Sequence, residues 1–546
     1  MTSYAQRPWL AVYRDGQPSD LEVEFTDVLS MFASALDREP HRDVLRYFDG
    51  SWTVERLAAE SDALAVALLD LGFAPGDRLV LFTQNDPAFV IGMLAAWKCG
   101  GIAVTANPMY KRRELGHVLG DSGATAVLCL DELHPVVTES APGTAVRIVV
   151  TYSALDGQTR GDARVMPSER GTPVGTHDLV DLLGQHAGAQ PPPVQPAGED
   201  VCFLVYTSGT TGDPKGAQLT HANFAFNAQS FRDWIGLEPD EGILGIAPLF
   251  HITGLVGHAM LALLVPAPLV LVHRFEPAVV LDAIREHRPV FTIGAITAFT
   301  ALSGAPGLVA DDLASLTKMY SGGAPIAPAV ADKLEARFGA YLHNAYGLTE
   351  TSSITHLVPP DRRAPVDPES GALSVGVPIS STVARILDDD GHEVAVGEIG
   401  EVAISGPQVA SGYWGRPDAT ATSFPNGELR TGDVGFMDAD GWFYLVDRKK
   451  DMIIASGYKV WPREVEDVLY GHPAVREAAV VGVPDDYRGE TVHAFVSLQD
   501  DAEVTADELI EHCKAQLAAY KYPRAVFFVD ELPKTASGKI LRRELR

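Results

Sequence analysis

The sequence predicts an α/β protein with a large N-terminal body of doubly wound sheets, a small β-barrel-like subdomain and a small α+β C-terminal domain. Apolar segments with helical and strand-like spacing interleave over the first part of the chain, as in doubly wound sheets. Short β-rich runs separated by glycines follow from about residue 372 to 446. After a cluster of charge at Asp447–Asp451 both periodicities restart, which indicates an independent module of about a hundred residues.

The interleaving begins close to the N-terminus. Residues 26–40 and 53–71 carry apolar side chains at helical spacing, which predicts two amphipathic helices. The short apolar run 77–82 follows a Leu-Gly helix end and predicts a buried strand. Residues 89–99 predict another helix, and residues 100–108 predict a strand that runs into a turn.

The pattern weakens between about residues 155 and 199. We expect a surface loop there, with a stiff spacer at Gln190–Gly198 because prolines favour extended backbone. The longest apolar stretch, Ala259–Val272, contains two prolines and falls short of the roughly 20 residues that a membrane helix needs. We therefore expect this stretch to be buried core, and we expect no integral membrane segment.

The C-terminal domain has its own order of elements. Its apolar runs differ in period, which separates helices from strands. The expected elements are a helix at 462–469, strands at 478–483 and 493–498, and a helix at 506–517.

Length, charge and cysteine content limit the classes of function. The chain has 546 residues, too many for one compact core, and a net charge of −29. This charge disfavours nucleic acids and anionic membranes as partners, because the summed field has the wrong sign. The N-terminus lacks the apolar core of a signal peptide, and no Cys-x-x-Cys pair suggests zinc or a disulfide framework, so the expected location is cytoplasmic. The cysteines are Cys99, Cys129, Cys202 and Cys513.

The segment Tyr206–Gly216 is rich in glycine and hydroxyl groups and contains one lysine, Lys215. Glycines let main-chain N–H groups turn inward, hydroxyls donate to phosphate oxygens, and the lysine adds a positive charge. It is not a Walker A motif, because in that motif the lysine directly follows a glycine, whereas here Asp213 and Pro214 separate Gly212 from Lys215. An apolar run precedes the segment, so we expect a phosphate-binding loop between a strand and a helix.

This segment resembles the phosphate-binding loop of adenylate-forming enzymes, the superfamily of acyl-CoA synthetases, peptide-synthetase adenylation domains and beetle luciferases. Six more segments occur in the order and approximate spacing of that superfamily, and the resemblance runs from about residue 25 to the last residue. They are Ala247–Gly254, Ser321–Pro325, Asn344–Thr351, Arg430–Gly435, Asp447–Ile453 and Pro533–Lys539.

The resemblance implies an AMP-forming acid–thiol ligase. Such an enzyme activates a carboxylic acid with ATP and Mg²⁺ to an acyl-AMP, releases pyrophosphate, and transfers the acyl group to coenzyme A. It also implies two domains: residues 1–447 form the adenylation body with the ATP and acyl pockets, and residues 448–546 form a mobile lid. The lid is expected to rotate between the half-reactions about a hinge at Lys450.

The resemblance assigns individual roles in the ATP site. Tyr346 is expected to stack on adenine, Asp433 to bind the ribose hydroxyls, and Arg448 to contact the ribose or the α-phosphate. Glu350 and Thr207 are the expected metal ligands, and a carboxylate suits Mg²⁺ as a hard oxygen donor. The expected ATP- and AMP-binding residues are Thr207, Ser208, Gly209, Thr210, Thr211, Gly212, Lys215, Gly323, Ala324, Pro325, Asn344, Ala345, Tyr346, Gly347, Thr349, Asp433, Arg448 and Lys539.

The two half-reactions require different neighbours at the reacting carbonyl. Lys539 is expected to pair with the substrate carboxylate and the α-phosphate during adenylation. The loop Ser456, Gly457, Tyr458 and Lys459 is expected to replace it for the attack by CoA, with Gly457 leaving room for the pantetheine arm. The expected catalytic residues are Lys539, Lys215, Thr349, Glu350 and His251.

His251 resembles the gate between the ATP and acyl pockets of the superfamily. The expected acyl pocket carries no charged residue for a second carboxylate or an amine, which disfavours amino acids and diacids. We also expect Gly257 to open a position that a larger side chain would narrow. The expected pocket residues are His251, Thr253, Leu255, Val256, Gly257, Ile296, Thr297, Phe299, Gly322, Gly323 and Gly347.

The substrate remains open among several classes. Asn107–Tyr110 resembles the Asn-Pro-x-Tyr of acyl- and aryl-CoA ligases, and Asp447–Ile454 most resembles fatty-acid–CoA ligases of medium to long chain. The alternatives are an aryl-acid ligase of the benzoate or cinnamate type, a fatty-acyl-AMP ligase that loads a carrier protein, and a luciferase-like oxygenase. A regulator without catalysis is disfavoured because the motif residues are present. The expected partners are small molecules, no nucleic acid is expected, and a homodimer is left open.

Overall fold

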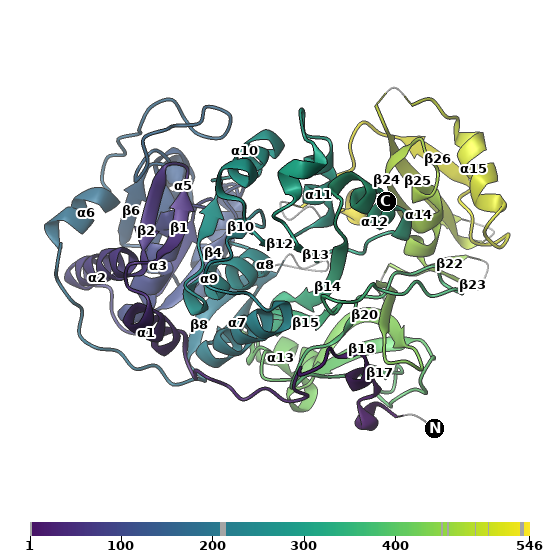
Figure 1. Ribbon diagram of the computed structural model, residues 1–546, viewed down its shortest axis with the longest axis horizontal. Coiled ribbons are helices and arrows are strands. Elements are labelled where there is room, and N and C mark those ends of the chain that lie inside the picture. The colour runs from purple at the N-terminus through teal and green to yellow at the C-terminus, as the bar shows by residue number, and fades with distance from the viewer. Residues whose placement is uncertain are drawn as a thin grey trace.

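The computed structural model describes residues 3–207, 214–448, 451–455, 458–485, 488–500, 502–535 and 540–545. In this part of the chain the strands form two large mixed sheets, a smaller antiparallel sheet and the sheet of a C-terminal α+β unit (Figure 1). The first 38 residues include the short turns η1 (Tyr4–Gln6) and η2 (Pro8–Val12) and the helix α1 (Val28–Arg38).

The first large sheet has the strand order β19-β9-β8-β4-β3-β5-β6-β7 among the described residues, and it is parallel except at β9 and β19. Its strands are β3 (Arg78–Phe82), β4 (Ile102–Ala106), β5 (Ala126–Leu130), β6 (Ile148–Tyr152), β7 (His177–Asp178), β8 (Val201–Thr207), β9 (Lys215–Thr220) and β19 (Gly412–Tyr413). The helices interleaved with them are α2 (Val54–Asp70), α3 (Pro87–Lys98), α4 (Arg112–Ser122), α5 (His134–Ser140) and α6 (Leu179–Gln185).

Both faces of this sheet are buried. In β3, Leu79 and Leu81 belong to the main hydrophobic core, whereas Val80 and Phe82 belong to a second cluster that includes α4. A strand covered on two sides needs apolar residues at every position, which explains the unbroken apolar run of β3.

The second large sheet has the order β16-β15-β14-β13-β12-β10-β11-β1-β2. Its strands are β1 (Asp43–Tyr47), β2 (Gly50–Thr53), β10 (Ile243–Gly245), β11 (Leu269–Leu271), β12 (Phe291–Gly294), β13 (Lys318–Ser321), β14 (Leu342–Leu348), β15 (Ser353–Leu357) and β16 (Val377–Pro378). Its helical segments are α7 (His221–Ile235), α8 (Ile252–Gly254), the π-helical η4 (Leu255–Met260), α9 (Leu261–Leu264), α10 (Pro277–His287), α11 (Ile296–Ser303) and α12 (Pro328–Phe338).

The β-rich region forms an antiparallel sheet in the order β17-β18-β20-β21, with β17 and β21 at its edges. The elements are β17 (Val383–Leu387), β18 (Gly400–Ser405), β20 (Leu429–Met437), β21 (Phe443–Arg448) and the helix α13 (Pro417–Ser423). The expected β-rich subdomain is confirmed. Its described strands form an open sheet, in which the edge strands β17 and β21 do not pair with each other.

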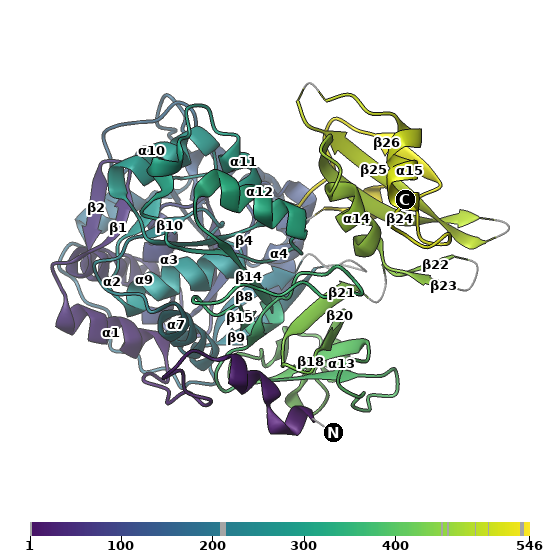
Figure 2. The same ribbon diagram turned by 45° about the vertical axis from the view of Figure 1, so that its right-hand side comes forward.

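The C-terminal elements form a separate unit beside the body (Figure 2). Its buried apolar residues form their own cluster, which includes Ile453, Leu469, Val480 and Leu509. The domain boundary after residue 447 stays a prediction. The elements are β22 (Ile453–Ala455), β23 (Tyr458–Val460), α14 (Pro462–Tyr470), β24 (Val475–Asp485), β25 (Gly489–Leu498), α15 (Ala506–Lys514) and β26 (Ala525–Phe528).

Two expectations need correction. The phosphate loop joins two antiparallel strands, β8 and β9, and the helix α7 begins only after β9, so the predicted order of strand, loop and helix is wrong. The region 155–199 also contains regular structure, the short strand β7 and the helix α6. Asp178 caps α6 by accepting from Val180 and Asp181, a local signal that the weak apolar pattern obscured.

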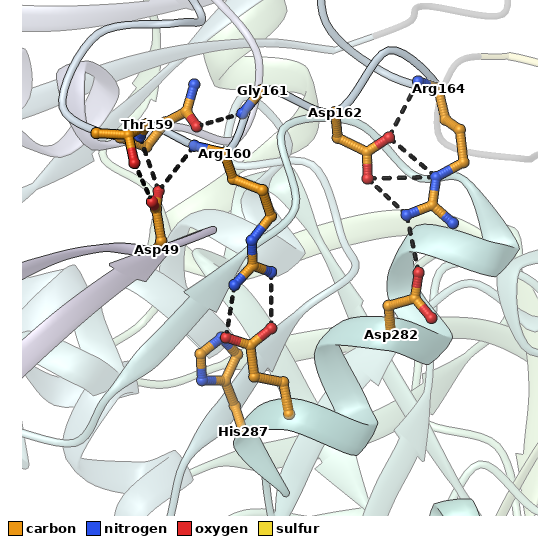
Figure 3. Close-up of polar contacts among 10 residues, drawn as sticks. Asp49, Thr159, Arg160, Gly161, Asp162, Arg164, Asp282 and His287 are labelled. Carbon is orange, nitrogen blue, oxygen red and sulfur yellow. Dashed lines mark hydrogen bonds and ion pairs between the residues drawn. The ribbon is translucent and has the colours of Figure 1, made fainter.

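The loop after β6 is held against the body by charged contacts (Figure 3). Asp49 accepts hydrogen bonds from the Thr159 hydroxyl and, at 2.8 Å, from the Thr159 backbone N–H, and these bonds lower the pKa of Asp49 to about 2. Arg160 pairs with both oxygens of Glu286 on α10, at 2.7 and 2.8 Å. Exposed pairs of this kind each contribute at most about 1 kcal/mol, so they fix the path of the loop more than they stabilise the fold.

The predicted apolar stretch 259–272 is buried in the main core, as expected. No helix among the described residues is long and apolar enough to cross a membrane.

Candidate active site

The ends of β8 and β9 place a hydroxyl beside a lysine. Thr207 is the last residue of β8 and pairs across the strands with Lys215, the first residue of β9. A Cβ atom on Gly216 would lie 3.3 Å from the Tyr206 ring, so glycine lets that ring cover β9. The predicted phosphate-binding residues Ser208, Gly209, Thr210, Thr211 and Gly212 lie outside the described residues.

The end of β14 and the middle of β20 bring two predicted ATP-site residues, Tyr346 and Asp433, into contact. The Tyr346 hydroxyl donates to Asp433 Oδ2 at 2.8 Å, and both side chains are buried. Residues 346 and 433 come from different sheets, so this contact joins the body to the β-rich subdomain. Asp433 also faces Arg448 across the β20–β21 pair, although the Arg448 side chain lies outside the described part.

Close backbone packing explains the glycines around this strand. A Cβ atom on Gly347 would lie 1.7 Å from the Ser353 carbonyl oxygen of β15. On the other side, a Cβ atom on Gly322 would lie 3.3 Å from the Ala345 carbonyl oxygen. Gly323 has φ +82°, a left-handed conformation that favours glycine. The structure therefore brings the predicted segments at 322–323 and 344–347 together.

Asn344 and Thr349 have structural partners within the same region. Asn344 Nδ2 donates to the Ser374 carbonyl at 3.0 Å, which ties β14 to the segment before β16. Thr349 begins the short turn η6 (Thr349–Thr351), and its carbonyl accepts from the Ser352 backbone at 3.1 Å. Ala324 is half-buried and Pro325 is exposed.

Tyr413 was not among the residues predicted from the sequence, yet it contacts two of them. Its hydroxyl donates to Glu350 Oε1 at 2.7 Å, and the Lys215 ammonium lies 5.0 Å from the centre of its ring. Burial and the Glu350 charge raise the pKa of Tyr413 above its usual range, so the hydroxyl stays protonated as the donor. A hollow of about 480 Å³ is lined by Glu350, Tyr413 and Thr431, among others.

The turn before α8 positions His251. The His251 ring caps α8, since its Nδ1 accepts from the Thr253 backbone at 3.3 Å. Asn85 holds the same turn from the other sheet: its Nδ2 donates to the Ala247 carbonyl at 2.9 Å, and its Oδ1 accepts from the Leu249 backbone at 2.7 Å. Sequence reasoning missed Asn85, because its partners lie more than 150 residues away along the chain.

The expected opening at Gly257 is wrong. A Cβ atom there would lie 2.8 Å from Ile293 and 3.2 Å from Phe231, so neighbouring side chains already fill the space. Two of the predicted pocket residues, Thr297 and Phe299, lie on α11, which follows β12, and Thr253 lies on α8, which packs near β12. Phe299 is buried, and Thr253 and Thr297 are half-buried.

The C-terminal predictions are largely untested. Lys450, Ser456, Gly457 and Lys539 lie outside the described residues, as does the Lys459 side chain. Tyr458 is exposed and stacks on Tyr520, with ring centres 4.6 Å apart.

Arg463 joins the C-terminal unit to the body. Its guanidinium donates to the Leu445 carbonyl at 3.1 Å and to the Ile326 carbonyl at 3.2 Å, and its backbone N–H donates to Asp447 at 3.2 Å. Arg542 also pairs with Asp447, at 3.3 Å. The buried Arg463 and the half-buried Arg542 thus hold the C-terminal unit against β21, and Arg463 also holds α14 against the segment between β13 and α12.

The donor set fits a magnesium–nucleotide complex. Glu350 and Thr207 offer the carboxylate and hydroxyl oxygens that suit Mg²⁺, and Lys215 supplies a cation for phosphate oxygens. The Asp433 carboxylate beside the Tyr346 ring offers an acceptor for ribose hydroxyls next to an aromatic surface. This arrangement can bind a nucleotide and place positive charge around its phosphates.

Comparison with known proteins agrees with this geometry. Residues 32–414 match the family model for AMP-binding enzymes, and residues 464–539 match the model for their C-terminal domain. The chain belongs to the AMP-binding enzyme family. It is an AMP-forming acid–thiol ligase, which uses ATP with Mg²⁺ and takes coenzyme A as a substrate.

Individual relatives differ in the acid they activate. The chain is 35% identical to the long-chain-fatty-acid–CoA ligase of Bacillus subtilis (strain 168), over 99% of this chain and 98% of that protein. It is 37% identical to the feruloyl-CoA synthase of Amycolatopsis sp., over 93% of this chain and 96% of that protein. The solved structure of an anthranilate CoA ligase with anthranoyl-AMP has a TM-score of 0.87 and 28% identity, covering 96% of this chain and 97% of that chain.

Proposed function

We propose that this enzyme activates a medium- to long-chain fatty acid and transfers it to coenzyme A. The carrying observation is the similarity to a long-chain-fatty-acid–CoA ligase over nearly the full length of both proteins. The described residues of the predicted acyl pocket agree with it, because they include no Asp, Glu, Lys or Arg.

An aryl-acid ligase is the second candidate, and the similarity to a feruloyl-CoA synthase favours it. The Phe299 ring, buried on α11, would pack against an aromatic acid as well as against an alkyl chain. A third candidate, a fatty-acyl-AMP ligase that loads a carrier protein, differs only in the acceptor.

In the first half-reaction a carboxylate must attack the α-phosphate of ATP, so two anions have to approach each other. Positive charge and fixed orientation lower that barrier. Lys215 and Thr207 would bind the phosphates, Asp433 the ribose, and Tyr346 the adenine. Magnesium bound by Glu350 would neutralise phosphate charge.

In the second half-reaction the thiol of CoA attacks the acyl-AMP, and we infer that the C-terminal domain rotates about Lys450 between the two steps. Lys539→Ala should then abolish adenylation while largely sparing thioester formation from supplied acyl-AMP. Lys450→Pro should do the reverse. Equal loss of both half-reactions in both folded variants would contradict the two-position mechanism.

The substrate is tested by AMP release that depends on ATP and CoA, across acetate, octanoate, palmitate, benzoate and coumarate, with the acyl-CoA confirmed by mass. Preferred turnover of octanoate or palmitate supports the fatty-acid proposal. Preference for benzoate or coumarate replaces it with the aryl-acid candidate. Pyrophosphate release without a CoA product indicates an adenylate that is passed to another acceptor.

The cellular setting is part of the same proposal. We propose that the enzyme acts in the cytoplasm, in fatty acid metabolism; a homodimer is the oligomeric state left open by the sequence. Fractionation of the native cells tests the location. Light scattering coupled to gel filtration tests the dimer, and a mass of one chain, 58.5 kDa, would reject it.

A further inference from the structure

Tyr413 lies between the two charged side chains that the proposed mechanism assigns to phosphate and metal. Its hydroxyl donates to Glu350 Oε1 at 2.7 Å, and its ring faces the Lys215 ammonium at 5.0 Å. Both Lys215 and Glu350 are half-buried, where opposite charges attract more strongly than in water. The ion pairs of the described residues do not include one between Lys215 and Glu350.

The backbone fixes Tyr413 in this place. The strand β19 pairs with β9, so that Tyr413 lies opposite Ala217. The Trp414 backbone donates to the Gly216 carbonyl at 2.8 Å, and the Ala410 backbone donates to the Glu350 carbonyl at 2.8 Å. The segment 410–414 therefore bridges the strand that carries Lys215 and the turn that carries Glu350.

The ring itself has little freedom. It packs edge-on against Phe424 with centres 5.4 Å apart, and the Tyr413 side chain is buried. The Tyr413 backbone N–H is held by the Thr420 hydroxyl at 2.9 Å. Because a tyrosine has only two side-chain torsions, these contacts fix both its hydroxyl and its face.

We propose that Tyr413 is a positioning residue for magnesium–ATP, a role that rests on the proposed function of Lys215 and Glu350. Its ring face supports the Lys215 ammonium through a cation–π contact. Its hydroxyl donates a hydrogen bond to Glu350 Oε1 and thereby orients the carboxylate so that Oε2 can bind the metal. As a spacer it also prevents the lysine and the glutamate from neutralising each other.

The two functions of the side chain separate by mutation. Tyr413→Phe keeps the ring and removes the hydroxyl, so it should disorder Glu350 but leave Lys215 supported. Losing a hydrogen bond to a charged group at a half-buried site changes an equilibrium constant by roughly tenfold. The Mg²⁺ concentration for half-maximal ATP binding should therefore rise about tenfold. Tyr413→Leu also removes the ring face and should weaken ATP binding further, because Lys215 can then pair with Glu350.

A matched control is available in the same chain. Tyr444 is buried, stacks on Phe436 and donates to the Asp438 carboxylate at 3.0 Å, but it contacts neither Lys215 nor Glu350. Tyr444→Phe removes the same kind of hydrogen bond and should leave ATP binding and its Mg²⁺ dependence unchanged.

Calorimetric titration of ATP at a series of Mg²⁺ concentrations is the primary measurement, because it needs no acid substrate and no turnover. Thioester formation from supplied acyl-AMP is the second, and it should be unchanged in Tyr413→Phe. If Tyr413→Phe binds ATP with the Mg²⁺ dependence of the unmodified enzyme, or if Tyr444→Phe shifts it equally, the proposal is wrong. A failure of the proposed function is distinguishable, because the unmodified enzyme would then bind magnesium–ATP yet activate none of the acids.

Discussion

Gly347→Ala tests the closest backbone approach in the candidate site. The added Cβ would lie 1.7 Å from the Ser353 carbonyl oxygen, 2.6 Å from the Ser353 carbonyl carbon and 2.8 Å from Ile354 Cα. Ordinary contacts between non-bonded heavy atoms are about 3.5 Å, so β15 would have to move away by about 1.5 Å or more. All three neighbours are backbone atoms, and no side-chain rotation can relieve the clash.

Such a shift breaks the pairing of β14 with β15. Hydrogen bonds lengthened by this amount are lost, and Tyr346 and Glu350 on either side of Gly347 would be displaced. We expect the free energy of unfolding to fall by about 4 kcal/mol or more, the range of severe core disruption, together with loss of ATP binding. Thermal or urea unfolding and calorimetric ATP titration measure the two effects.

Gly184→Ala is the matched control for this substitution. Gly184 lies in α6, and a Cβ atom there meets nothing within 4 Å. Alanine is a better helix former than glycine by about 1 kcal/mol, so stability should stay equal or rise. The reasoning would be refuted by a Gly347→Ala protein that unfolds within about 1 kcal/mol of the unmodified enzyme and binds ATP normally.

Three further substitutions test other parts of the structure. Burial raises the pKa of Asp86 to about 7. The folded state therefore keeps a proton that the unfolded chain releases above about pH 4, and stability should decrease as the pH rises from 4 to 7. Asp86→Asn should flatten this slope in urea unfolding at pH 4.5 and 7.5, and an unchanged slope would contradict the pKa. Asn85→Ala removes buried hydrogen bonds to the turn before His251, so it should cost about 2–4 kcal/mol of stability and lower kcat/KM for the acid more than it weakens ATP binding. Arg463→Met removes two hydrogen bonds to body carbonyls, and we expect faster proteolysis between residues 447 and 460, an effect that equal cleavage rates would rule out.

Much of the fold could be predicted because its signals are local. The helix α2 begins at Val54 after the capping residue Thr53, within one residue of the predicted start, since both the cap and the apolar spacing lie in the same short segment. The strands β24 and β25 were likewise expected as apolar runs. The short elements β7 and α6 were missed because few residues contribute to their pattern.

The sequence identified individual residues of the candidate site, but it did not show which of them contact one another. Motif resemblance singled out Tyr346 and Asp433 separately, and the structure adds the hydrogen bond that joins them across two sheets. The prediction about Gly257 failed because a missing side chain leaves space only if no neighbour fills it. Ile293 and Phe231 fill it, and both come from other segments of the chain.

The error at the phosphate loop and the omission of Tyr413 have the same physical origin. Residues 215–220 follow a glycine-rich loop and precede a helix, so the sequence around them favours the strand–loop–helix order. Their actual strand pairs on one side with β8 and on the other with β19, which lies almost 200 residues later. That second pairing is what carries the Tyr413 ring to Lys215 and its hydroxyl to Glu350. Strand pairing over such a separation depends on the whole sheet, so a residue whose role comes from that pairing is visible only once the fold is known.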